Sequence, residues 1–257
     1  MTGKTYVKLR IWLSRQCSRL SAWRMRRKAA RQIGVDFCTV RSFSLPHDIV
    51  VNDMPVRLDL PCEEGQITAF VEILLDDCYH LRKLSSSAEI ITVIDVGANA
   101  GVFSIAARKA FPRAKIHAYE PNPELGIRLR KLAEQIDFTY YAEAIGRKNG
   151  MVKLVTQPGL SIMTKTVADE AGPNIQISLR SALHRIGGNV DLLKLDCEGA
   201  EWELFKDRSA WAKVRYLTME YHLDPGEDHC RIFKALDVEP QQVVPGLSEA
   251  TDRRFGF

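Results

Sequence analysis

Apolar and polar positions change their period several times along the chain, and each change predicts an element of secondary structure. Five short apolar runs rich in β-branched residues predict buried strands, at about residues 91–96, 115–119, 139–144, 190–196 and 216–221. Helical periodicity fills the intervals between them. Because strands that alternate with helices are typical of a parallel sheet, the pattern predicts an α/β domain with a doubly wound, mostly parallel sheet.

The segment before this domain carries two further patterns. Apolar and polar residues alternate over residues 48–60 on both sides of an Asn52-Asp53 turn, which predicts a hairpin. Residues 66–84 have apolar positions three and four apart, which predicts one amphipathic helix that ends at the serines after Leu84. We therefore expect three parts: a basic amphipathic segment (1–35), a hairpin and helix cap (36–88) and the main domain (89–257).

Two weaker patterns lie within the main domain. Asn149-Gly150 followed by an apolar run predicts an extra hairpin strand. Residues 157–175 contain two prolines and two glycines and predict a loop that covers the site. The last stretch, from residue 237 onward, has only weak strand signals.

Composition fits this picture and excludes several classes of protein. At 257 residues and 46% apolar composition, the chain can bury a full core. The six cysteines form no Cys-x-x-Cys pair, which argues against a zinc site or a disulfide framework and favours a reducing, cytoplasmic setting. No apolar run approaches the roughly 20 residues that span a bilayer.

The net charge of +4 is concentrated at one end of the chain. Residues 1–33 hold ten Lys or Arg and no acid, which leaves 26 bases against 32 acids in the remainder. Apolar residues at helical spacing from Leu9 to Trp23 make this a candidate for a basic amphipathic helix on an anionic membrane surface. A helix packed on the domain with its basic side in water and a targeting presequence are the alternatives. No nucleic-acid partner is expected, because the acidic remainder offers no continuing basic surface.

The sharpest motif follows the first predicted strand. It reads Asp95-Val-Gly97-Ala98-Asn99-Ala-Gly101, and Glu120-Pro121 ends the next strand. Such glycines let the backbone approach a nucleoside, and the later carboxylate can bind ribose hydroxyls. Asn99 replaces the glycine that a dinucleotide pyrophosphate requires, and an acid at Asp95 suits an ammonium group rather than a phosphate. The pattern therefore resembles the first motif of S-adenosylmethionine (SAM) methyltransferases.

Polar residues also end the two later strands. Lys194, Asp196 and Glu198 alternate along one strand and its end, and Glu220 and His222 do so on the next. Ligands of open α/β sheets bind at the carboxyl ends of strands, so we expect both groups to meet the Gly97 loop at one edge of the sheet.

The ordered set of motifs resembles the FkbM family of methyltransferases from about residue 89 to residue 222. It comprises the Asp95 motif, Tyr119-Glu120-Pro121, Ala144-Ile-Gly146, Asp191-Leu-Leu-Lys194-Leu-Asp196-Cys-Glu198-Gly-Ala-Glu201 and Glu220-Tyr-His222. The resemblance implies a Rossmann-like, class I fold and O-methylation of hydroxyls on sugars or secondary metabolites. It implies SAM contacts at Asp95, Gly97, Asn99, Gly101 and Glu120, and we add Ala98, Pro121 and Glu143 as candidates, although Glu143 stands where the family commonly has a small polar residue. It implies acceptor-side roles for Asp196, Glu198, Glu220 and His222, and we add Lys194 as a further candidate on that side.

Several alternatives stay open from the sequence. We expect His222 and Asp196 to act together as base or orienting groups, while Lys194 beside Asp196 can instead form a structural ion pair. No metal is predicted, although carboxylate and imidazole ligands here would also suit Mg²⁺ or Mn²⁺. An NAD-dependent oxidoreductase and a non-catalytic, membrane-associated binding module are the rival functions.

Overall fold

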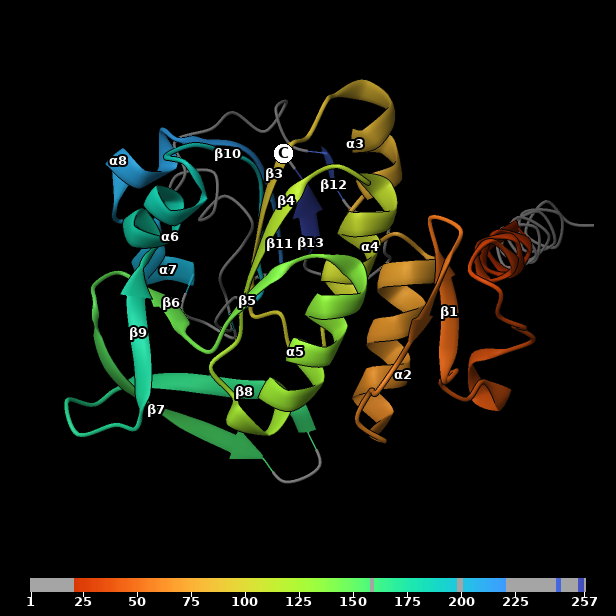
Figure 1. The fold of residues 1–257 in the computed structure, drawn as a ribbon, viewed down its shortest axis with the longest axis horizontal. Coiled ribbons are helices and arrows are strands. Elements are labelled where there is room, and N and C mark those ends of the chain that lie inside the picture. Colours follow the sequence, from red (N-terminus) through yellow and green to blue (C-terminus); the bar gives the residue numbers. More distant parts are fainter. Residues whose placement is uncertain (1–20, 158–159, 198–200, 221–243, 246–253, 257) are drawn as a thin grey trace, which may run out of the picture.

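The computed structural model describes residues 21–157, 160–197, 201–220, 244–245 and 254–256 (Figure 1). Its centre is a seven-stranded sheet. In spatial order the strands are β5 (Thr139–Tyr141), β4 (Lys115–Tyr119), β3 (Thr92–Val96), β10 (Val190–Leu195), β11 (Val214–Glu220), β13 (Arg254–Gly256) and β12 (Val244–Pro245). The first five are parallel, and β13 runs antiparallel to β11. The mostly parallel sheet predicted from the sequence is confirmed.

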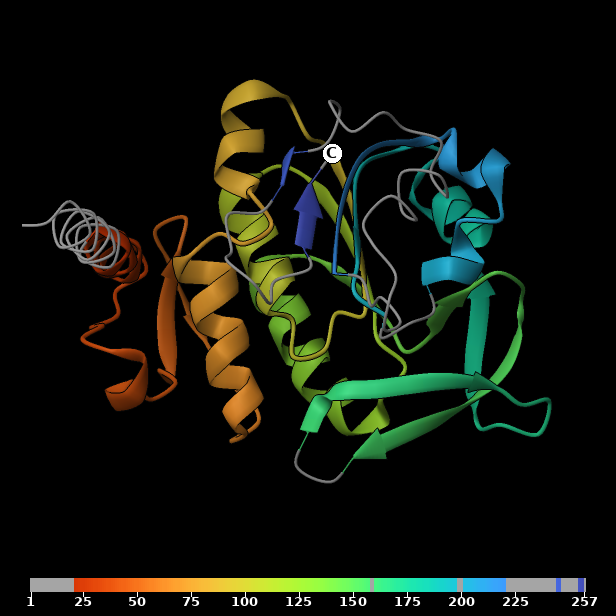
Figure 2. The same ribbon diagram turned by 180° about the vertical axis from the view of Figure 1, so that it is seen from behind.

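Helices cover both faces of this sheet. Figures 1 and 2 show α4 (Val102–Ala110) and α5 (Pro123–Ile136) on one side, and α6 (Leu179–Ile186), α7 (Glu201–Leu204) and α8 (Arg208–Trp211) on the other. Each face has its own apolar core, because successive side chains of a strand point to opposite faces. Val93 and Leu192 pack with α4 and α5, whereas their neighbours Ile94 and Leu193 pack with α6.

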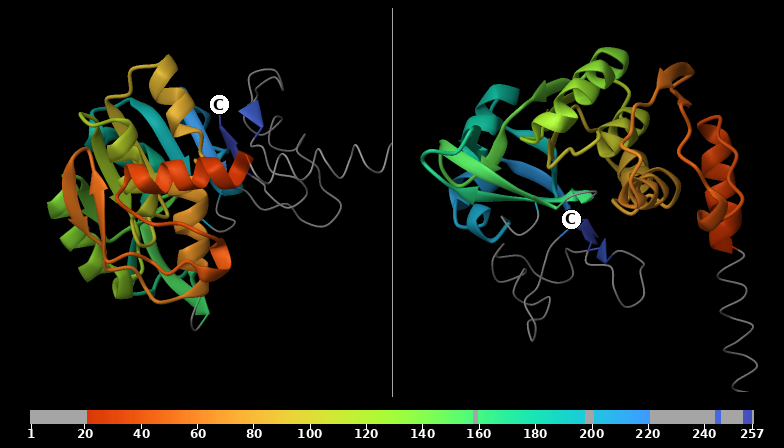
Figure 3. Two further views of the ribbon diagram at one scale, coloured as in Figure 1. Left: turned by 90° about the vertical axis from the view of Figure 1, so that its right-hand side faces the viewer. Right: turned by 90° about the horizontal axis from the view of Figure 1, so that it is seen from below.

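The segment before the sheet packs on the α4 side. It comprises a helix over residues 21–32, a 3₁₀ turn η1 (Val40–Ser42), strands β1 (Asp48–Val51) and β2 (Met54–Arg57), α2 (Glu64–Phe70), a π-helical turn η2 (Val71–Leu75) and α3 (Leu81–Ser87). The predicted hairpin is confirmed: β1 and β2 pair antiparallel around Asn52 and Asp53, both with positive φ. Figure 3 shows the 21–32 helix at the outer edge of the molecule. None of the helices in the described part of the chain is long and apolar enough to cross a lipid bilayer.

The prediction of one helix over residues 66–84 is wrong. The chain forms α2 and η2, turns through residues 76–80 and only then begins α3. Asp77 and His80 have positive φ, and the Asp77 carboxylate accepts the backbone N–H groups of Leu81 and Arg82 at 2.8 and 3.0 Å. Asp77 thus satisfies two of the first backbone donors of a new helix whose N-cap residue is His80, a feature that apolar spacing alone does not reveal.

Two further predictions fail in the region after β4. The predicted 139–144 strand divides, because β5 stays in the central sheet while β6 (Ala144–Gly146) joins a second sheet of order β6-β9-β7-β8. The strand predicted after Asn149 is confirmed as β7 (Gly150–Gln157). The loop predicted over residues 157–175 is wrong, because β8 (Leu160–Ala168) and the start of β9 (Asn174–Ser178) occupy it. Its glycines and prolines fall in the two connections between these strands rather than along one long loop.

A buried ion pair joins β3 to β10. The Nζ atom of Lys194 lies 3.2 Å from Oδ1 of Asp95, and the two side chains are 3% and 0% exposed. The same ammonium donates to the carbonyl oxygens of Val96 (3.1 Å) and Gly97 (2.7 Å), while the Ser104 hydroxyl donates to Oδ2 of Asp95 at 2.8 Å. Two strands and α4 are therefore connected through one charge cluster.

Replacing Lys194 with Met should lower the free energy of unfolding by about 3–5 kcal/mol, because Asp95 would keep a buried charge without its partner. Urea denaturation measures this change. Lys213→Met removes an exposed lysine next to β11 and should change stability by less than about 0.5 kcal/mol. Equal stability of the two variants would contradict the role given to the pair.

Candidate active site

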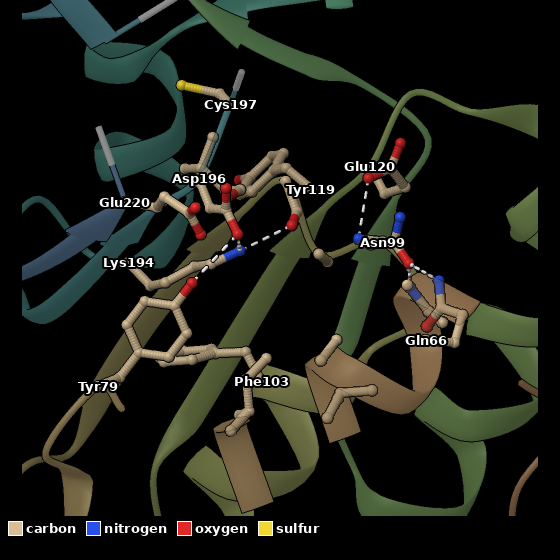
Figure 4. Close-up of a pocket in the computed structure, with 18 of the residues that line it drawn as sticks. Gln66, Tyr79, Asn99, Phe103, Tyr119, Glu120, Lys194, Asp196, Cys197 and Glu220 are labelled. Atoms are coloured by element: carbon tan, nitrogen blue, oxygen red, sulfur yellow. Dashed lines mark hydrogen bonds and ion pairs between the residues drawn. The ribbon is translucent and has the colours of Figure 1, made fainter. Parts of the chain in front are cut away.

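The main candidate pocket lies where the chain leaves the sheet in opposite directions. β3 leads to β4 on one side, whereas its neighbour β10 leads to β11 on the other, which makes their carboxyl ends a topological switch point. The pocket is lined by the residues that follow β3 and β4, by the ends of β10 and β11, and by α2, η2 and Tyr79 of the N-terminal segment (Figure 4). The polar groups predicted to meet at one sheet edge line this pocket as far as the structure describes them.

The loop after β3 packs directly on the end of β10. Gly97 has φ +73°, and a Cβ atom there would lie 1.9 Å from the backbone oxygen of Asp196. Asn99 also has positive φ, and its Oδ1 atom accepts bonds from the Ala100 N–H (2.7 Å) and from Nε2 of Gln66 (2.6 Å). Glycine at position 97 is therefore required by both conformation and contact.

Glu120 follows β4 and is almost fully buried at the pocket wall. One carboxylate oxygen accepts the Asn99 N–H and the other accepts the Asn122 N–H, both at 2.9 Å. Burial raises the pKa of Glu120, and these two backbone bonds oppose the rise by stabilising the charged form. Since a carboxylate offers about four acceptor positions, Glu120 has capacity left for ligand hydroxyls.

Asp196 stands at the end of β10 on the opposite wall. Its Oδ2 atom accepts the Tyr79 hydroxyl at 3.1 Å and lies 3.6 Å from Nζ of Lys194 (Figure 4). Burial alone would lower the pKa of Lys194, but the charges of Asp95 and Asp196 outweigh burial and raise it. The raised pKa favours the protonated form of Lys194, which is the form that pairs with Asp95 and Asp196.

Most predicted site residues come together in this pocket. The lining includes Gly97, Ala98, Asn99, Glu120, Pro121, Lys194, Asp196 and Glu220. Glu198 and His222 lie outside the described residues.

Three predicted residues are not part of the lining. Asp95 is fully buried beneath the loop and engaged by Lys194 and Ser104, so its position does not support a contact with a ligand ammonium. Gly101 caps α4 with φ +84°. Glu143 forms an ion pair with Arg185, whose guanidinium lies over the Tyr141 ring.

The sequence analysis missed the residues that the N-terminal segment contributes. Gln66 is fully buried and bonds Asn99, and Tyr79 is 3% exposed and bonds Asp196. Thr68, Glu72 and Ile73 also line the pocket. No motif marks these positions, and the helix predicted over residues 66–84 was expected only to cover one end of the main domain. Their role depends on the π turn and the reversal before α3, which bring them to the pocket.

The metal alternative finds no assembled ligand set in the described part of the chain. No group of three or more His, Cys, Asp or Glu side chains there is arranged to hold a metal ion. Two of the residues named for the metal alternative, Glu198 and His222, lie outside the part of the chain that the structure describes.

Fold and pocket together define a nucleoside-binding α/β protein, with a glycine-containing loop at a switch point and a buried carboxylate after the second strand. Comparison with known families makes this more specific. Residues 95–243 match the model of the methyltransferase FkbM domain, which is more than half of the chain. The chain belongs to the FkbM methyltransferase family. This assignment confirms the class predicted from the sequence, a methyltransferase with SAM as the methyl donor.

Individual relatives are distant. The methyltransferase sdnD of Sordaria araneosa is 28% identical over 191 residues, covering 59% of this chain and 73% of that protein. The AMB antimetabolite synthetase AmbE of Pseudomonas aeruginosa is 27% identical over 198 residues, which cover 60% of this chain and only 9% of AmbE. Among solved structures, Aeropyrum pernix fibrillarin with natively bound S-adenosyl-L-methionine aligns over 70% of this chain and 72% of its own, with 14% identity and a TM-score of 0.44.

Replacing Gly97 with Ala should weaken SAM binding by at least about tenfold, because a positive φ and a backbone contact both oppose a side chain there. Isothermal titration calorimetry with SAM measures the change. Gly150→Ala is the matched control, because a Cβ atom at Gly150 meets nothing within 4 Å. Wild-type affinity in Gly97→Ala would show that this loop does not form the SAM site.

Proposed function

We propose that this protein transfers the methyl group of SAM to a hydroxyl of a sugar, glycan or secondary metabolite. The observation that carries the proposal is the facing pair of carboxylates in one pocket: Glu120 beside the glycine loop and Asp196 at the end of β10. The first suits the donor's ribose, and the second suits the hydrogen of an acceptor hydroxyl.

The charge of the pocket fits SAM better than a dinucleotide. Among the described lining residues, four acids (Glu72, Glu120, Asp196 and Glu220) stand against one base, Lys194. SAM carries a net positive charge, whereas the pyrophosphate of NAD is negative and would meet these acids without the usual glycine at position 99. This electrostatic balance opposes the oxidoreductase alternative.

The bonds around Asp196 indicate how the protein would orient the acceptor hydroxyl. Bound SAM supplies a methyl carbon that is already activated by its sulfonium, so the protein has chiefly to orient an acceptor oxygen. Tyr79 and Lys194 both face Oδ2 of Asp196, and no described residue donates to Oδ1. We assign Oδ1 to the acceptor hydroxyl, as an orienting group or base. His222, on the segment that follows β11 in the sequence, is the second candidate base.

Replacing Asp196 with Asn should lower kcat by about 10²–10⁴, the range expected when acid–base assistance is lost. Tyr79→Phe removes only the hydroxyl that holds Asp196 and should lower kcat by about 10- to 150-fold, since a hydrogen bond to a charged group contributes about 1.5–3 kcal/mol. Initial rates of methyl transfer from labelled SAM measure both effects, and calorimetry should show a much smaller change in SAM affinity. Unchanged turnover in Asp196→Asn would exclude the role assigned to Asp196.

His222→Ala separates the two candidate bases. A large loss of turnover in this variant, with SAM affinity retained, would assign proton removal to His222 and leave Asp196 to orient the acceptor. Unaffected turnover would leave Asp196 as the base. A binding module without catalysis predicts no transfer by any variant or by the wild type.

The acidic lining should also select against anionic acceptors. A hexoside and the matching uronic acid differ in one carboxylate, and we expect the neutral compound to have at least about tenfold higher kcat/KM because like charges repel in a partly desolvated pocket. Glu72→Gln removes one charge from the pocket lining and should reduce the difference in kcat/KM between the two acceptors. Glu134→Gln removes an exposed charge on α5, outside the pocket lining, and should leave that difference unchanged. Preference for the uronic acid would refute this electrostatic account.

A further inference from the structure

The helix over residues 21–32 is fixed to the domain by one face. Ala29 and Ala30 are buried on this face, and Ile33 just beyond the helix joins the same core. The Arg26 guanidinium forms two bonds of 2.6 Å with the carboxylate of Asp76, directly after η2. This pair raises the pKa of Arg26, chiefly through the hydrogen bond to Asp76. The helix is therefore anchored, and its orientation is defined.

The opposite face of the helix is strongly basic. Arg24, Arg27, Lys28 and Arg31 are spaced three or four residues apart, which places them on one side of a helix. Together with Trp23 and Gln32 they line a shallow groove, and no acid is among its lining residues. The Arg27 guanidinium lies 4.8 Å from the centroid of the Trp23 ring, whose N–H is bound to the Cys38 carbonyl at 2.7 Å. We call these four cations the basic face.

We propose that the basic face binds an anionic lipid surface. The rest of the sequence is consistent with this partner, because residues 1–20 add five Lys or Arg without an acid and repeat apolar residues at helical spacing. A planar membrane touches one face of the molecule, whereas an extended nucleic acid would also meet the acidic remainder of the chain.

The anchored geometry links lipid contact to the pocket wall. Asp76, which holds Arg26, directly follows η2, and Glu72 and Ile73 of η2 line the pocket. A membrane-bound form would thus be attached through the same element that closes the candidate active site. This inference does not depend on the proposed reaction, because vesicle binding is measured without SAM or acceptor.

The test is flotation of the full chain with vesicles of phosphatidylcholine, with and without about one third phosphatidylserine. We expect binding only to the anionic vesicles, weakened by added salt. A variant with Arg24, Arg27, Lys28 and Arg31 all changed to Gln should bind at least about tenfold more weakly, since each basic residue near such a surface contributes about fivefold in affinity. The matched control changes Arg113, Lys131, Lys148 and Lys153 to Gln, four exposed bases of equal total charge outside the helix, and should bind as the wild type does.

Three results would overturn the proposal. Equal loss of binding in both variants would show that net charge, and not the basic face, is responsible. Equal binding of the wild type to neutral and anionic vesicles would exclude an electrostatic lipid site. Tighter binding to a duplex RNA than to anionic vesicles at the same ionic strength would assign the face to nucleic acid instead. Circular dichroism of both variants verifies that each is folded.

Discussion

The ammonium of Lys194 is the charge on which both the sheet centre and the pocket depend. Burying it is unfavourable, and the structure offsets this with the carboxylates of Asp95 and Asp196 and two backbone carbonyls. Asp95 lies beneath the glycine loop and Asp196 lines the pocket, so one cation sets the position of a buried acid and of an acid at the pocket wall. Because the accepting carbonyls belong to Val96 and Gly97, the same interaction also holds the start of the loop that we assign to SAM.

The segment before the family-matched region completes this site rather than merely covering it. Gln66 bonds Asn99 in the loop after β3, and Tyr79 bonds Asp196 at the end of β10. Both reach the pocket because the chain passes from α2 through a π turn and reverses before α3. Residues 64–79 therefore contact three features: the loop after β3, the carboxylate of Asp196 and the anchored helix over residues 21–32.

Sequence patterns predicted the regular parts of the molecule and failed where the backbone is irregular. Apolar runs located five central strands, and the order of motifs identified the family. Both succeeded because a buried strand and the polar residues at its end are neighbours in the sequence. The break at residues 76–80 depends on the left-handed residues Asp77 and His80, and β6 leaves the central sheet because it pairs with β9, where Ala144 lies opposite Gln176. Periodicity records neither feature. Asp95 shows a related limit: its residue type suggested ligand contact, and no local pattern revealed the buried ion pair that it forms with Lys194, 99 positions away. Gln66 and Tyr79 had no motif at all.

The central claim is that the pocket between Glu120 and Asp196 binds SAM. Calorimetric titration of the purified wild-type chain with SAM, with NAD as the competing ligand and Glu120→Ala as the site variant, tests it most directly. We expect one SAM to bind per chain, no heat from NAD, and a loss of SAM affinity of at least about tenfold in Glu120→Ala, since the hydrogen bonds of a charged carboxylate are removed. Binding of NAD without SAM, or SAM binding that is unchanged in Glu120→Ala, would contradict the account.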